Sequence, residues 1–156
     1  MKCVRWGLLI LCIALPLAVA GTHSWSDEKE KSLPSPLVAS RQRITSEHVD
    51  TWEKKKDLRG LSLCECELDD GVVPRISKLS ELTYLNLGHT KQIRDADVKQ
   101  LAALQKLKLL CLAFTGVTNS GTSHLKGLTE LEWLDLYGTV VTDESLAHLA
   151  GLKKLR

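Results

Sequence analysis

Cysteine and histidine are the side chains of this sequence whose chemistry could define a site. Cys64, Cys66 and Cys111 lie in the body of the chain, and His124 and His148 are 24 residues apart (148 − 124). Thiols and imidazoles at regular spacings are typical of disulfide frameworks and zinc sites. The common nucleophile, metalloprotease, phosphate-loop and dinucleotide-binding motifs are missing from the sequence. We therefore predict that the protein is not an enzyme.

One leucine pattern, Leu-x-x-Leu-x-Leu, recurs along residues 58–156 and must position these side chains. Its copies begin at Leu58, Leu82, Leu107 and Leu131, and a fifth opens at Leu155. Successive copies are therefore 24 or 25 residues apart (82 − 58, 107 − 82). The period-2 leucines predict a short strand, and a following apolar pattern with a spacing of three predicts one to two turns of helix. A fixed period of this length indicates a solenoid of stacked units.

The pattern resembles the leucine-rich-repeat family over roughly residues 44–156, in particular the short repeats of internalin-like proteins and F-box adaptors. The resemblance implies an α/β fold: a right-handed leucine-rich-repeat solenoid with short parallel strands on a concave face and short helices on a convex face. About four repeats are expected, at 58–81, 82–106, 107–130 and 131–154, with a truncated fifth from 155. Counting from the first leucine, position 9 holds small side chains that can bond backbone groups under the turn; they are Cys66, Thr90, Thr115 and Thr139.

Residues 44–57 fit the second half of a further unit. Ile44 falls at position 11 and Trp52 at position 19, and a helix is expected from about Ser46 to Lys56. Because the end of a solenoid needs a cover for its core, we interpret 44–57 as an N-terminal helical cap in which Trp52 covers the first layer.

The predicted geometry argues against a metal site. The chain is expected to turn after its strands at Gly88, Gly116 and Gly138, which places His124 and His148 on the outer helices. Adjacent helices lie roughly 8–10 Å apart, which is far for two imidazoles to share one zinc at about 2.0 Å each. We predict exposed helix surface here, with no metal and no cofactor.

The same geometry argues against disulfides. Cys64 and Cys111 are expected two strands apart, roughly 9–10 Å, which exceeds the Cα separation of about 7 Å that a disulfide tolerates. Cys64 and Cys66 share one strand and are poorly oriented for a bond. We expect free thiols, with Cys66 buried.

The candidate site is the concave face, formed by positions 3, 5 and 7 of each unit. Strand residues there point away from the leucine core, so several large side chains are expected to form one exposed patch. Aromatic residues in such a patch are typical anchors of protein interfaces. Alternatively, these side chains pack on one another or a continuation of the chain covers them. The predicted protein-binding residues are Tyr84, Asn86, Leu109, Cys111, Trp133, Asp135 and Tyr137.

The N-terminal region has the layout of an export signal. Lys2 and Arg5 precede an apolar run, and Ala18-Val19-Ala20 precedes Gly21, so we predict a cleaved signal peptide at 1–20. The alternative is a membrane anchor at 6–20, although a spanning helix needs about 20 residues. Residues 21–43 combine mixed charge with serine and proline, and they are expected to be a flexible linker.

Cleavage would leave 19 basic and 19 acidic residues (21 − 2 against 19), so the charge gives no reason to expect nucleic acid as a partner. We predict a secreted or periplasmic protein–protein interaction module with no small-molecule substrate. The alternatives are a truncated fragment or remnant of a longer repeat protein, or an F-box-type substrate adaptor. Self-association through an uncapped C-terminal end is a further expectation.

Overall fold

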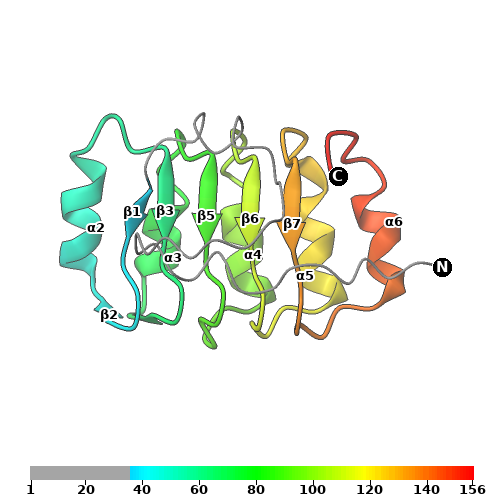
Figure 1. Ribbon diagram of the computed structural model, residues 1–156, viewed down its shortest axis with the longest axis horizontal. Helices are drawn as coiled ribbons and strands as arrows, with labels where there is room; N and C mark the ends of the chain where they lie inside the picture. The colour runs from blue at the N-terminus through cyan, green and yellow to red at the C-terminus, as the bar shows by residue number, and fades with distance from the viewer. Residues whose placement is uncertain (1–35) are drawn as a thin grey trace, which may run out of the picture.

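The computed structural model describes residues 36–156, which form a solenoid of two layers (Figure 1). One layer is a five-stranded sheet in the order β1-β3-β5-β6-β7, and every pairing in it is parallel. Its strands are β1 (Leu37–Val38), β3 (Gly60–Ser62), β5 (Tyr84–Asn86), β6 (Leu109–Cys111) and β7 (Trp133–Asp135). Successive strands pair at the repeat spacing, so Leu61 lies opposite Leu85, and Leu85 opposite Leu110. The predicted α/β solenoid with short parallel strands is confirmed.

Short helices form the second layer, behind the sheet in the view of Figure 1. They are α2 (Ser46–Glu53), α3 (Val72–Ile76), α4 (Asp95–Leu101), α5 (Asn119–Ser123) and α6 (Leu146–Leu149), with 3-10 turns η1 (His124–Gly127) and η2 (Asp143–Ser145). Each helix packs against the next one along the solenoid. Within residues 36–156 we find no helix with the length and apolar content needed to cross a bilayer.

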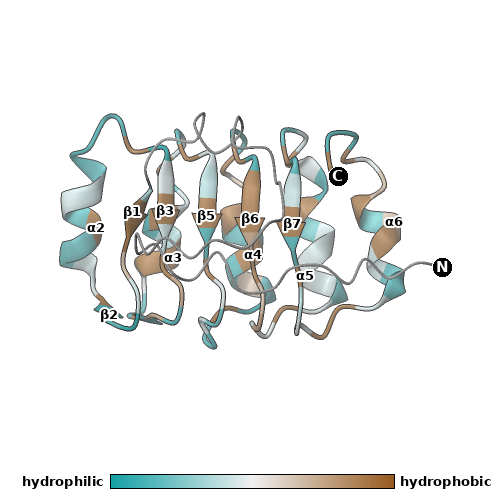
Figure 2. Cartoon of the chain, in the orientation of Figure 1, coloured by the Kyte–Doolittle hydropathy of each residue, from teal (hydrophilic) through white to brown (hydrophobic). Residues whose placement is uncertain are grey.

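The core between the layers is a ladder of leucines. Positions 4 and 6 of three successive units are fully buried; these residues are Leu61, Leu63, Leu85, Leu87, Leu110 and Leu112. In Figure 2, β6 is hydrophobic along its length, whereas β5 and β7 each include a polar residue. Burial weakens in the last unit, where Leu134 is half-buried and Leu146 is 64% exposed. Leu146 is the first residue of α6, and among residues 36–156 this helix packs against other helices on one side only.

Residues 36–43, which were predicted to belong to a flexible linker, instead contribute to two strands. β1 extends the main sheet beside β3, and β2 (Arg43–Ile44) pairs with β4 (Glu67–Leu68) in a second, two-stranded parallel sheet. Residues 36–57 therefore form a whole degenerate unit rather than a half-repeat. In that unit α2 ends at Glu53, earlier than expected, and Trp52 is buried in the core. The predicted signal peptide and the first part of the predicted linker lie outside the described residues.

The turns after the strands also differ from the prediction. Glycines were expected to shape them, yet Gly88 and Gly116 are not in the left-handed region. Position 8 is the left-handed residue of every unit, with φ between 54° and 68° at Arg41, Glu65, His89, Phe114 and Gly138. The N–H of position 8 donates to the position 7 carbonyl of the next unit, as from His89 to Ala113 and from Phe114 to Tyr137. This backbone ladder stabilises a conformation that side-chain-bearing residues rarely adopt.

Small polar side chains satisfy the backbone beneath these turns. The Thr90 hydroxyl donates to the Leu63 carbonyl of the preceding unit at 2.9 Å, and the Cys66 thiol donates to the Ala39 carbonyl at 3.3 Å. Thr115 donates to a carbonyl within its own unit at 2.6 Å. The role predicted for position 9 is confirmed, including at the cysteine.

A second polar ladder connects the helix starts of successive units. The carboxylate of Asp95 on α4 accepts the Thr118 N–H at 2.8 Å and the Thr118 hydroxyl at 2.6 Å. One unit later, the Asn119 side chain accepts the Thr142 N–H at 2.9 Å and donates to the Thr142 hydroxyl at 2.8 Å. The starts of α5 and η2 are thus held by the preceding helix, which satisfies backbone donors that a short helix leaves open.

Candidate functional site

The candidate site is the sheet face that points away from the helices, here called the strand face. It consists of positions 3, 5 and 7 of each unit, because the leucines between them point into the core. Along this face the side chains are mostly buried on β3 and β5 and become accessible on β6 and β7. The accessible part carries Leu109, Trp133 and Asp135, all half-buried, and Tyr137, which is 55% exposed.

Tyr84 was expected to lie open on this face, and that expectation is wrong because it is only 7% exposed. Its ring lies beside Gly60 of the preceding strand, where an added Cβ would lie 3.4 Å from Tyr84 Cδ1. Burial raises the pKa of the Tyr84 phenol above its usual value, although hydrogen bonds with the side chains of Asn86 and Ser62 act in the opposite direction. Tyr84 is therefore part of the packing of the strand face.

Asn86 and Cys111, two further predicted site residues, are also buried. Asn86 Oδ1 accepts the Gly88 N–H at 2.8 Å, and this bond fixes the side chain along its own strand. An added Cβ at Gly88 would lie 3.2 Å from Cys111 Sγ, so the thiol fills the space left by the glycine. The structure thus divides the seven predicted residues into a buried group, Tyr84, Asn86 and Cys111, and an accessible group on β6 and β7.

The accessible group is centred on β7. Trp133 and Asp135 alternate with Leu134, which packs on the core, so both point to the strand face. Asp135 Oδ1 accepts the Tyr137 N–H at 2.9 Å, and the Cys111 thiol lies 3.7 Å from Oδ2. The register places Leu109 opposite Trp133. A tryptophan, a carboxylate and a tyrosine therefore follow one another along a single strand and its exit.

Two aromatic residues that the sequence analysis left out lie at the rim of this group. The rings of His89 and Phe114 are stacked, with centroids 4.3 Å apart, and Phe114 meets Tyr137 edge-on at 5.2 Å. Phe114 also lies over Gly138, where an added Cβ would come within 2.6 Å of its ring. His89 and Phe114 are 25 residues apart (114 − 89) and both occupy position 8 of their units. This shared repeat position could have indicated from the sequence that the two rings lie side by side.

Cys64, Cys66 and Cys111, the cysteines in the described part of the chain, form no metal cluster with other ligands. Cys66 is a free and buried thiol, as predicted, and burial raises its pKa above the usual value. Cys64 and Cys111 are buried as well. His124 is half-buried at the start of η1 and His148 is exposed on α6, which places both on the helix side of the solenoid. Residues 36–156 contain no group of three or more histidine, cysteine or acidic side chains arranged to hold a metal ion.

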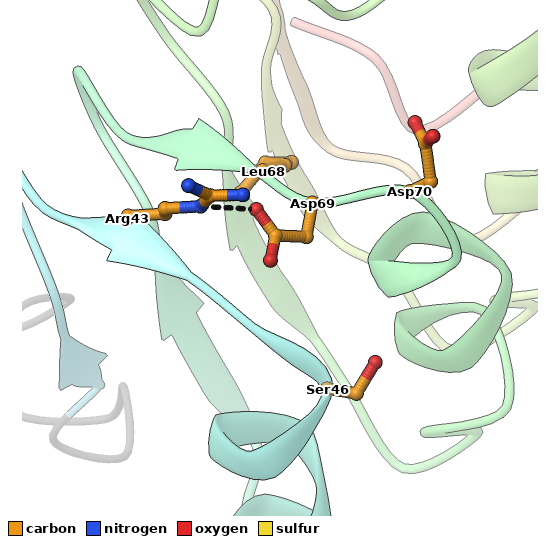
Figure 3. A pocket seen from close by; sticks show the side chains of 5 residues that line it. All are labelled: Arg43, Ser46, Leu68, Asp69 and Asp70. Carbon is orange, nitrogen blue, oxygen red and sulfur yellow. Dashed lines mark hydrogen bonds and ion pairs between the residues drawn. The ribbon is translucent and has the colours of Figure 1, made fainter.

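A polar hollow of about 450 Å³ lies at the other end of the solenoid, lined by residues of β2, β4 and the start of α2. Two of its three charged lining residues form an ion pair, since Arg43 Nε lies 2.6 Å from Asp69 Oδ1. Figure 3 shows this ion pair, with Ser46 and Asp70 lying apart from it. The hollow therefore lacks convergent groups for catalysis or ligand binding, and the strand face remains the candidate site.

The repeat sequence and the two-layer architecture define a leucine-rich-repeat solenoid. No protein-family model matches the sequence, and no curated protein matches it. Among solved structures, the chain is similar to the internalin InlF of Listeria monocytogenes, with a TM-score of 0.56 and 28% sequence identity over 64% of this chain. It is also similar to internalin C2 of the same bacterium, with a TM-score of 0.51 and 31% identity over 63% of this chain. The chain is a leucine-rich-repeat protein with internalin-like repeats.

These likenesses concern part of each internalin. The match covers 27% of the InlF chain and 39% of the internalin C2 chain.

Proposed function

We propose that the protein is a protein–protein interaction module that binds its partner on the strand face. The observation that carries this proposal is the accessible group on the strand face, in which Trp133 lies opposite Leu109 on the parallel sheet and Tyr137 follows at the exit of β7. Large aromatic side chains that are already held in place lose little conformational freedom on binding, and they supply most of the binding energy at protein interfaces.

The helix side offers a poorer surface for a partner. Some of its charged side chains are engaged with one another between units: Arg75 of α3 pairs with Asp50 and Glu53 of α2, at 2.5 Å and 2.7 Å. Exposed ion pairs of this kind contribute little to binding, and a partner would have to desolvate them. The strand face instead presents apolar area together with one carboxylate.

The proposal includes the cellular location of the protein. A signal peptide at 1–20, cleaved before Gly21, would deliver the protein to the periplasm or the exterior, where it would meet proteins rather than cytosolic ligands. The similarity of the repeats to internalin repeats supports this view at the level of the protein class. An N-terminal anchor at 6–20 would keep the same module at the membrane surface.

Site-specific photo-crosslinking tests the location of binding. A benzophenone amino acid placed at Trp133 or at Leu109 should yield a discrete protein adduct in the producing organism. The same group at Lys126 or His148 on the helix side should yield none. The partner identified by mass spectrometry is then purified and titrated into the wild-type protein and the Trp133→Ala variant. Adducts that form at the helix positions alone would refute binding on the strand face.

A further inference from the structure

The stripe formed by Trp133, Asp135 and Tyr137 has a charge that the fold itself does not neutralise. The contacts of the Asp135 carboxylate are the Tyr137 N–H and the Cys111 thiol, and no cation within residues 36–156 pairs with it. Other carboxylates of the solenoid differ in this respect. Glu81 is paired with Lys106 at 2.5 Å, and Glu130 with Lys154 at 2.7 Å.

Two aromatic side chains flank this carboxylate. Residues two apart on a strand point to the same face and lie roughly 7 Å from one another, so Trp133 and Tyr137 stand on either side of Asp135. A partner side chain that lies over Asp135 would have an aromatic side chain on either side of it along the strand, and the carboxylate between them. Aromatic faces attract cations through their quadrupole, and a carboxylate adds a charge-assisted hydrogen bond.

Phe114 supports the Tyr137 side chain at one end of this stripe. Phe114 meets the Tyr137 ring edge-on, and the other contacts of Phe114, with His89 and with the backbone at Gly138, hold it in place. A Cβ at position 138 would collide with the Phe114 ring, so the glycine permits this packing. Phe114 is thus a positioning residue for Tyr137.

We propose that the Trp133–Asp135–Tyr137 stripe binds an arginine or lysine side chain of the protein partner. This inference rests on the proposed function and names the chemistry of the partner at that site. Arginine is the better fit, because its planar guanidinium can stack on an aromatic ring while its N–H groups donate to a carboxylate. Charge complementarity selects this partner over an apolar one, since an apolar side chain would leave the Asp135 carboxylate desolvated and unpaired.

The test uses a phage-displayed library of random dodecapeptides, selected on the exported protein. Selected peptides should carry arginine or lysine. In a synthetic copy of one such peptide, replacing that arginine by citrulline, which keeps the shape and removes the charge, should weaken binding at least tenfold. Asp135→Asn should cause a similar loss, because it removes the negative charge. Asparagine can still accept the Tyr137 N–H, so the local structure should be kept. Citrulline and Asp135→Asn combined should add little further loss. Glu130→Gln, the matched control at an ion-paired carboxylate, should leave the affinity unchanged.

The outcomes separate this inference from the proposed function. If Trp133→Ala abolishes peptide binding while citrulline and Asp135→Asn leave it intact, the strand face is the site and the basic ligand is refuted. If Trp133→Ala has no effect and binding maps to the helix side, both proposals are refuted. A library that yields binders without arginine or lysine also overturns the basic ligand. Phe114→Ala should weaken binding several-fold and broaden the NMR signals of the Tyr137 ring, and an unchanged ring would contradict its positioning role.

Discussion

Replacing Leu110 by alanine is the sharpest test of the leucine ladder. Leu110 is fully buried at position 4 of β6, between Leu85 and Leu134 of the flanking strands. Truncation of a fully buried leucine costs the transfer free energy of the lost carbons plus a term for the cavity, about 2–5 kcal/mol in total. We expect Leu110→Ala to fall within that range, because strands on both sides limit how far the site can collapse.

The structure supplies two controls for this substitution. Leu134 occupies the same position one unit later but is half-buried, so Leu134→Ala should cost less, about 1–2 kcal/mol. Leu146 is 64% exposed, and Leu146→Ala should change the free energy of unfolding by less than about 0.5 kcal/mol. Together the three leucines span the observed range of burial.

Urea unfolding followed by circular dichroism measures these differences, provided that the m-value stays constant across the variants. A repeat protein can lose cooperativity, and a changed m-value would reveal this. Equal losses at the three leucines, or a larger loss at Leu146 than at Leu110, would refute the burial gradient from which the magnitudes were worked out.

Two further predictions concern particular contacts, and a third concerns the N-terminal sequence. Gly121→Ala should destabilise the protein although alanine favours helix, because the new Cβ would lie 2.4 Å from Asp95 Oδ1; thermal melts should show partial rescue by Asp95→Ala, and a stabilised single variant would contradict this. The folded-state pKa of Cys66 is raised by burial, so its contribution to stability is complete below the unfolded pKa near 9.0 and declines as pH rises above it. Cys66→Thr, which keeps a hydroxyl for the hydrogen bond to Ala39, should lose less stability between pH 7 and pH 10 than the wild type in urea melts, and an equal loss in both proteins would contradict this. The exported protein should begin at Gly21, and an intact mass that includes residue 1 would favour the membrane anchor instead.

The repeating core could be predicted from the sequence because its signal is periodic. Leu61, Leu85 and Leu110 recur at the unit spacing and were placed correctly on adjacent strands. The first unit was missed because its position 6 is Ala39 and its position 1 is a proline, although Leu37 precedes Leu61 by the unit spacing of 24 residues (61 − 37). A pattern of leucines alone does not detect a unit that has lost most of them.

The backbone conformation of the turns and the exposure of the site residues depend on interactions that a repeating sequence pattern does not reveal. The left-handed residues include Arg41 and Phe114, whose types do not favour that conformation, because hydrogen bonds between units impose it. Tyr84 has the same repeat position as Trp133, yet it is buried and its ring lies beside Gly60 on the neighbouring strand. Side-chain exposure on a sheet depends on the residues across the strands as well as on those along them.

The most direct test of the central claim is the affinity of the crosslinked partner for two alanine variants, measured by isothermal titration calorimetry. Trp133→Ala should weaken binding at least tenfold, which corresponds to about 1.4 kcal/mol or more, and it should leave the thermal midpoint nearly unchanged because position 3 points away from the core. His148→Ala, on α6, should bind like the wild type. A tenfold loss for His148→Ala together with wild-type affinity for Trp133→Ala would contradict binding on the strand face.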